Sequence, residues 1–170
     1  MLKFFLSSSL VLLCSALFES SILSNLTFLP AIPDISLICV LFLALHNGKL
    51  YGEGTGFISG LMLDFLSSGP FGFNCLLRTL IGYTAGWFNK TLNTEGFFVS
   101  MFLGFCATLI KGLYILFIHL LFPKTSMIYN PLSFVFLFEL IFNTILTPFI
   151  FKFLNLFKKS LILNPENTIQ

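Results

Sequence analysis

Long hydrophobic runs, separated by short polar or proline-containing breaks, make up almost the whole sequence. An α-helix needs roughly 20 mostly apolar residues to cross the ~30 Å hydrocarbon core of a bilayer. The pattern therefore predicts a single transmembrane domain built from six helices. The predicted spans cover about residues 4–25, 32–46, 50–66, 71–88, 97–122 and 131–156, and a polar cytoplasmic tail follows over 157–170.

The composition indicates a membrane as the surroundings of these helices. Hydrophobic residues account for 56% of the chain and charged residues for 9%, and the mean hydropathy is +0.97. A chain with so little polar surface cannot cover a soluble globule. We therefore expect an all-α integral membrane protein in contact with the lipid bilayer. The net charge of only +2, without a long basic run, argues against nucleic acid as a partner.

The basic residues outside the predicted spans determine the expected orientation. Loops on the cytoplasmic side of a membrane carry an excess of Lys and Arg. If both termini face the cytoplasm, only Lys124 of these residues lies outside. The lysines on the inner side are then Lys3, Lys49, Lys90, Lys152, Lys158 and Lys159. Both termini are therefore expected in the cytoplasm.

Two spans joined by the turn 67–70 combine regularly spaced glycines with buried charges. Two series at intervals of four residues each lie along one helix face: Gly52, Gly56, Gly60 and Asp64 in the first helix, and Arg78, Gly82 and Gly86 in the second. Glycine faces let two helix backbones approach closely in lipid. A buried carboxylate beside a buried guanidinium costs far less than either charge alone. The spacing therefore predicts a closely packed helical hairpin with an intramembrane Asp64–Arg78 ion pair.

The last two spans carry a further pair of opposite charges. Lys111 lies near the middle of its span and Glu139 in the outer half of the next, antiparallel span. By the same argument they form a possible second ion pair. Structural pairing is the favoured role for Asp64 and Arg78, with partner contact or the handling of a ligand or proton as alternatives.

No residue pattern indicates catalysis, a cofactor or a metal. The sequence has no HExxH zinc motif, no glycine-rich phosphate loop and no pair of aspartates such as an intramembrane protease needs. The cysteines are isolated within apolar runs, at Cys14, Cys39, Cys75 and Cys106. Neither a disulfide framework nor a metal site is expected from them. We therefore expect a protein that is not an enzyme and needs no cofactor.

Several motifs between residues 29 and 90 resemble those of a known family. The run Leu29-Pro30-Ala31-Ile32-Pro33-Asp34 leads into an apolar span, and the glycine series ending at Asp64 follows it. The run Leu80-Ile81-Gly82-Tyr83 then lies in the next span. Together with the length and the span count, these motifs resemble the rod shape-determining MreD family, with Pro33 and Asp34 as family-motif residues.

The resemblance implies a protein of the bacterial inner (cytoplasmic) membrane that belongs to the cell-elongation machinery. The implied function is a non-enzymatic scaffold that supports cell shape and peptidoglycan synthesis. The implied partners are MreC, penicillin-binding protein 2 and RodA, with the actin-like MreB reached indirectly. The face of Gly52, Gly56 and Gly60 would suit the docking of a partner helix, unless the following span covers it.

A second hypothesis comes from another class of protein. A six-span bundle with charges gathered toward its outer half is similar to the substrate-binding subunit of an energy-coupling-factor vitamin transporter, a fold that the MreD family is thought to resemble. The two hypotheses share an architecture and differ in the interior. A vitamin binder lines an outer cavity with converging aromatic and polar groups, whereas a scaffold fills this space with side chains.

Overall fold

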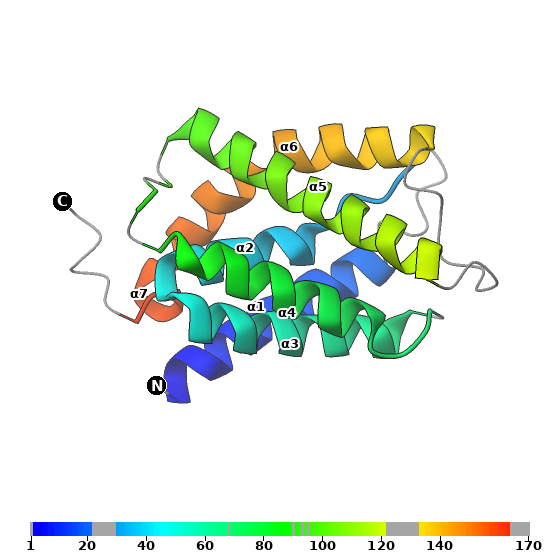
Figure 1. Cartoon of the computed structure of the whole chain (residues 1–170). Helices are drawn as coiled ribbons and strands as arrows, with labels where there is room; N and C mark the ends of the chain where they lie inside the picture. Colours follow the sequence, from blue (N-terminus) through cyan, green and yellow to red (C-terminus); the bar gives the residue numbers. More distant parts are fainter. Residues whose placement is uncertain are drawn as a thin grey trace.

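The computed structural model describes residues 2–21, 30–67, 69–89, 91–92, 94, 96–121 and 133–163. Every regular element in these ranges is an α-helix, which confirms the all-helical prediction for this part of the chain. The helices are α1 (Leu2–Ser21), α2 (Ile35–Asn47), α3 (Lys49–Leu66), α4 (Phe73–Trp87), α5 (Phe97–Leu121), α6 (Phe134–Asn155) and α7 (Lys158–Leu161). Successive long helices run in opposite directions (Figure 1).

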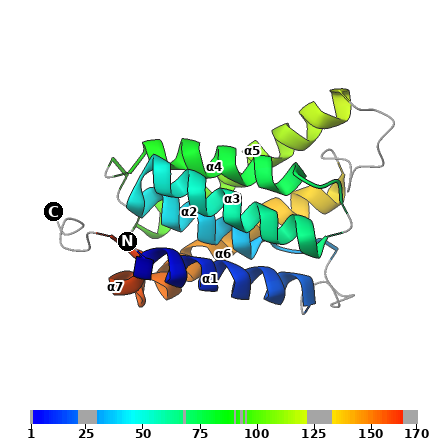
Figure 2. The same ribbon diagram turned by 90° about the horizontal axis from the view of Figure 1, so that it is seen from below.

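Helix α2 lies at the centre of the bundle. It contacts α1 and each helix from α3 to α6, and residues 36–45 are all buried. A helix that is apolar on every side has no face suited to water, so it lies either in the protein interior or against lipid. The contacts of α2 place it in the interior. Figures 1 and 2 show α2 between the α3–α4 pair, the α5–α6 pair and α1. The other helices are thus arranged around α2.

Helices α3 and α4 pack against each other through their glycine faces. A Cβ atom added at Gly52 would overlap the carbonyl oxygen of Gly82, and one at Gly60 would overlap the Cα atom of Cys75. A Cβ at Gly86 would likewise meet the backbone of Lys49. The glycine face of α3 is therefore filled by α4 and is not available to a partner helix.

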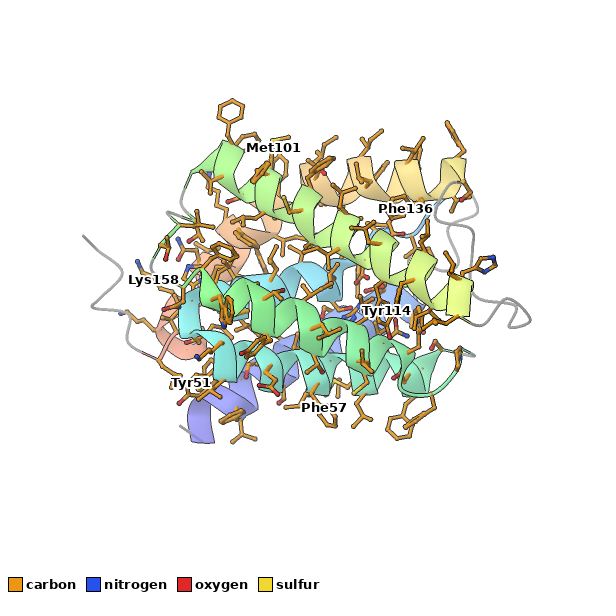
Figure 3. All side chains as sticks on the ribbon, viewed as in Figure 1. Tyr51, Phe57, Met101, Tyr114, Phe136 and Lys158 are labelled. Atoms are coloured by element: carbon orange, nitrogen blue, oxygen red, sulfur yellow. The ribbon has the colours of Figure 1, made fainter. Side chains whose placement is uncertain are left out.

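Helices α5 and α6 form a second pair that also depends on glycines. Gly104 lies against the side chain of Thr147, and Gly112 lies against the ring of Phe136. Figure 3 shows Phe136 reaching from α6 toward α5. On the other side of α5, Tyr114 contacts Phe73, the first residue of α4. The centroids of the two rings are 5.3 Å apart.

The chain after α6 does not leave the bundle at once. The Ser7 hydroxyl donates a 2.8 Å hydrogen bond to the carbonyl oxygen of Ser160, and the Asn47 amide donates one of 2.9 Å to that of Leu161. The Leu161 side chain is only 1% exposed. Part of the range predicted as a polar tail is thus packed on the bundle, because the apolar side chains at 161–162 are buried. The cytoplasmic location of this tail stays a prediction.

Within the described residues, three helices are long and apolar enough to cross a membrane, namely Phe4–Ser21, Phe97–Leu121 and Phe134–Asn155. Helix α2 is apolar but has only 13 residues, about 20 Å at 1.5 Å per residue. The crossing of the membrane by α2, α3 and α4, and hence the count of six spans, stays a prediction. Large apolar side chains on the outer surface of α5 are exposed, as lipid contact would require, including Phe98 (83%) and Leu120 (75%).

The close packing of α3 on α4 can be tested with one methyl group. A Cβ at Gly56 would overlap the carbonyl group of Arg78, so Gly56→Ala must push the two helices apart. We expect a loss of about 1–3 kcal/mol in the free energy of unfolding, measured by denaturant titration in detergent.

The matched control is Gly54→Ala in the same helix. A Cβ at Gly54 meets nothing within 4 Å, so only the higher helix propensity of alanine should act there. Equal stability of the two variants would contradict the glycine-mediated packing.

Candidate functional site

A network of charged and polar side chains lies inside the bundle, in the half that is distant from the start of α1. Six elements contribute to it. Its members are Glu19 of α1, Asp34 and Ser36 at the start of α2, Ser59 of α3, Arg78 of α4, Lys111 of α5, and Glu139 and Asn143 of α6. Because nearly every helix supplies a residue, the network connects the whole bundle.

Arg78 is the most deeply buried charge in the network, with 1% of its surface exposed. Its Nη2 atom forms an ion pair with Oδ1 of Asp34. Its Nη1 atom donates hydrogen bonds to the hydroxyl groups of Ser36 (2.6 Å) and Ser59 (2.7 Å). A buried cation needs both a counter-charge and hydrogen-bond acceptors to offset its lost hydration. α2 and α3 together supply them.

Asp34 is the acceptor at the centre of the network. Its Oδ1 atom also accepts a 2.9 Å hydrogen bond from the backbone N–H of Leu37, so the carboxylate caps α2. Its Oδ2 atom lies 2.7 Å from Nζ of Lys111. Its backbone N–H donates to Oδ1 of Asn143 at 2.9 Å. One carboxylate at a helix start thus contacts two cations and positions the first turn of α2.

Lys111 connects the centre of the network to α6. Its Nζ atom lies 2.6 Å from Oε1 of Glu139 as well as 2.7 Å from Asp34. The structure therefore brings together Lys111 and Glu139, which the sequence suggested as a second pair, and adds Asp34 to them. The side chains of Glu139 and Asp34 are each 4% exposed, so this interaction is shielded from solvent.

The predicted Asp64–Arg78 ion pair is wrong. Asp64 instead accepts hydrogen bonds at the start of α4, from the backbone N–H groups of Gly72 (2.9 Å), Asn74 (3.0 Å) and Cys75 (3.1 Å), and from the Asn74 amide at 3.0 Å. The first N–H groups of a helix have no partner within the helix and attract an anion. Asp64 satisfies these groups, while the Arg78 side chain reaches α2.

Sequence reasoning missed several members of the network. Oε2 of Glu19 accepts hydrogen bonds from the hydroxyl (2.8 Å) and the backbone N–H (3.3 Å) of Ser36. The Ser36 hydroxyl thus lies between Glu19 and Arg78. The apolar sequence of α2 does not by itself indicate a central helix, because α5 is equally apolar and nevertheless exposes Phe98 and Leu120 on its outer surface.

The network contains three carboxyl groups and two cations, namely Glu19, Asp34 and Glu139 with Arg78 and Lys111. Its charges are almost balanced, and the binding of one proton would make it neutral. The described part of the chain contains no group of three or more His, Cys, Asp or Glu residues that could hold a metal. The arrangement acts chemically as a set of ion pairs that connect helices.

Comparison with protein families agrees with the resemblance seen in the sequence. The family model described as rod shape-determining protein MreD matches residues 1–157, which include all six long helices and the network. The chain belongs to the MreD family. Membership of the MreD family implies a role in determining rod shape and a location in a membrane. In the curated proteins and in the solved structures there is no match, so the similarity to transporter subunits stays a prediction.

The family-motif residues Pro33 and Asp34 gain a structural meaning here. Both are buried, and the Pro33 carbonyl oxygen accepts a 3.1 Å hydrogen bond from the N–H of Ile35. Asp34 pairs with Arg78 and Lys111. In this MreD protein the motif therefore starts the central helix and supplies one counter-charge that both cations share.

The pairing of Asp34 with Arg78 can be tested by a double-mutant cycle. Asp34→Asn should cost about 3–5 kcal/mol in the free energy of unfolding, because it leaves Arg78 buried without a counter-charge. Combining it with Arg78→Gln should cost less than the sum of the single losses. Denaturant titration of the purified protein in detergent measures all four free energies.

Two comparisons make this test specific. Glu53→Gln removes an exposed carboxylate from α3 and should leave the stability unchanged. A cycle of Asp64→Asn with Arg78→Gln should be additive within about 0.5 kcal/mol. Strong coupling of Asp64 with Arg78, or none of Asp34 with Arg78, would refute the arrangement described here.

Proposed function

We propose that this protein is a non-enzymatic scaffold of the bacterial cell-elongation machinery in the inner membrane. It supports cell shape and peptidoglycan synthesis by holding MreC and the wall synthases RodA and penicillin-binding protein 2 in one assembly, which reaches MreB indirectly. The observation that carries the proposal is the match of the rod shape-determining MreD family over residues 1–157.

The chemistry of the interior supports a scaffold. The buried carboxylates Asp34 and Glu139 are engaged by Arg78 and Lys111, and Asp64 is engaged by the backbone of α4. Groups that satisfy each other in this way stabilise the packing of helices and are not poised to act on a substrate.

The proposed topology has six spans with both termini in the cytoplasm. The start of α1 and the helix α7 lie at the same end of the bundle, as a hydrogen bond between Ser7 and Ser160 requires. Figure 1 shows the start of α3, the end of α6 and α7 at this end, and these elements carry the lysines at 49, 152, 158 and 159. A concentration of lysine at one end favours that end as the cytoplasmic one.

The surface for a partner helix must lie outside the contact between the glycine faces of α3 and α4. The glycines at 52, 56 and 60 are occupied by α4, so they cannot also receive the membrane helix of MreC. In this proposal MreC and the synthases contact the apolar, lipid-facing outer surface of the bundle. Side-chain packing drives the association of helices in lipid. The exposed Phe and Leu side chains of this surface are available for such packing.

The alternative, a vitamin-binding subunit of an energy-coupling-factor transporter, has less support. A vitamin binder would have its cavity in the outer half of the bundle, but there the side chains of the charge network fill the interior, and Arg78 and Asn143 are each 0–1% exposed. A scaffold is expected to have an outer half of this kind, and a vitamin binder is not.

Depletion of the protein from a rod-shaped or helical host tests the scaffold. We expect the cells to become round and to lose the organised incorporation of new wall material. Microscopy with a fluorescent wall precursor measures both changes. A plasmid copy carrying Glu53→Gln should restore the shape, whereas one carrying Asp34→Asn should not, because the bundle would be unstable.

Affinity purification from native membranes tests the partners. MreC should co-purify with the wild-type protein and with the Glu53→Gln control.

Unchanged cell shape and wall incorporation after depletion would overturn the proposal. Tight, stoichiometric binding of a vitamin by the purified protein would favour the alternative.

A further inference from the structure

A cavity of about 410 Å³ lies near the other end of the bundle, away from the charge network. It is formed by the end of α2, the segment before α5, the first turn of α5 and the last turns of α6. The network residues do not line it. It is therefore a separate feature that the scaffold function does not explain.

The cavity adjoins the proline in α6. Pro148 has no N–H group to donate to the carbonyl oxygen of Thr144, so one helical hydrogen bond is missing at this point. Proline inside a helix commonly causes a kink. Figure 1 shows the last part of α6 turning away from the line of its first part, and Pro148 itself lines the cavity. The bend leaves space between this part of α6 and the start of α5.

The cavity is lined by both aromatic and polar side chains. The aromatic ones, called the aromatic wall below, are Phe42, Phe97 and Phe151. Lys152 and Asn155, one helical turn apart at the end of α6, are polar members of the lining. A site with an apolar and a cationic side is suited to a molecule that is itself amphipathic and negatively charged.

The polar side of the cavity has a positive electrostatic character. Lys152 is exposed, and no carboxylate of the described residues forms an ion pair with it. The N-terminus of α5, with Phe97 as its first residue, lies beside the cavity and adds the positive end of a helix dipole. The imidazole of His46, whose Nε2 atom lies 3.2 Å from the Thr94 hydroxyl, is a further polar group in the lining.

We propose that this cavity binds the phosphate-bearing headgroup of an anionic membrane phospholipid. The phosphate lies beside Lys152 and Asn155, and the first methylene groups lie on the aromatic wall. A volume of about 410 Å³ holds a headgroup but not whole acyl chains, so the chains must leave through the open side. Exposed rings next to the cavity provide an apolar exit, since Phe97 and Phe149 lie 6.2 Å apart between centroids and are 53% and 59% exposed.

This inference needs the protein to be in a membrane but does not depend on its proposed partners. In the proposed topology, the lipid belongs to the cytoplasmic leaflet. The bound headgroup would join α2, α5 and α6 at the end of the bundle where the charge network is absent. At this end the lipid would add to hydrogen bonds within the chain, such as those from Ser7 and Asn47, whereas ion pairs hold the other end.

Native mass spectrometry of the full-length protein in detergent tests the proposal. The protein is titrated separately with phosphatidylglycerol and with phosphatidylcholine. We expect one tightly retained phosphatidylglycerol and at least about fivefold weaker retention of phosphatidylcholine, because one lysine beside an anionic headgroup contributes a factor of about this size.

The variants locate the site. Lys152→Gln should abolish the roughly fivefold preference, whereas Lys152→Arg should keep it. Asn155→Asp, which changes charge but not size, should also lower phosphatidylglycerol retention by repulsion. The matched control is Lys159→Gln, which removes an exposed lysine of the same end that does not line the cavity. Thermal unfolding of each variant verifies that it is folded.

A competition arm distinguishes a lipid from free phosphate. Millimolar inorganic phosphate should not displace the bound phosphatidylglycerol, since the aromatic wall contributes to lipid binding. Complete displacement by phosphate would overturn the assignment to a lipid. An unchanged lipid preference in both Lys152→Gln and Asn155→Asp, or an equal loss in Lys159→Gln, would overturn the assignment to this cavity.

Discussion

The burial of Arg78 is the constraint on which the rest of this bundle depends. A guanidinium that is 1% exposed inside an apolar bundle requires a counter-charge and hydrogen-bond acceptors. Asp34 supplies the charge from the start of α2, and serine hydroxyls of α2 and α3 supply acceptors. Because these partners come from different helices, the position of one charge restricts the positions of three helices. Lys111 and Glu139 extend the same restriction to α5 and α6.

Glycine packing and charge pairing depend on each other in this fold. The glycines of α3 allow α4 to approach backbone to backbone, which brings Ser59 within 2.7 Å of Arg78 Nη1. Asp64 fixes the start of α4 by accepting its unpaired N–H groups. Without these close contacts, Arg78 would have fewer acceptors and its burial would cost more. Small residues and charges thus act as one structural unit, although they lie at different positions along the helices.

A self-contained interior fits a protein of the MreD family, whose described role is the determination of rod shape. The polar groups of the network interact with each other, while exposed Phe and Leu side chains cover the outer surface of α5 and α6. A scaffold of this kind would act through its lipid-facing surface. The kink region of α6 differs from the rest, because it leaves a cavity with a cationic side.

The sequence alone predicted the helices and the close approach of the glycine faces of α3 and α4, because these follow from apolar length and regular spacing. The family came from the resemblance of its motifs between residues 29 and 90. It also suggested Lys111 and Glu139 as neighbours. It failed for Arg78, which pairs with Asp34 and not with Asp64, and it missed Glu19, Ser36 and Ser59. Spacing along a helix gives the depth and the face of a charge, but not which of several neighbouring helices that face meets. Only the tertiary structure decides this, because the position of α2 at the centre determines which groups surround each buried charge.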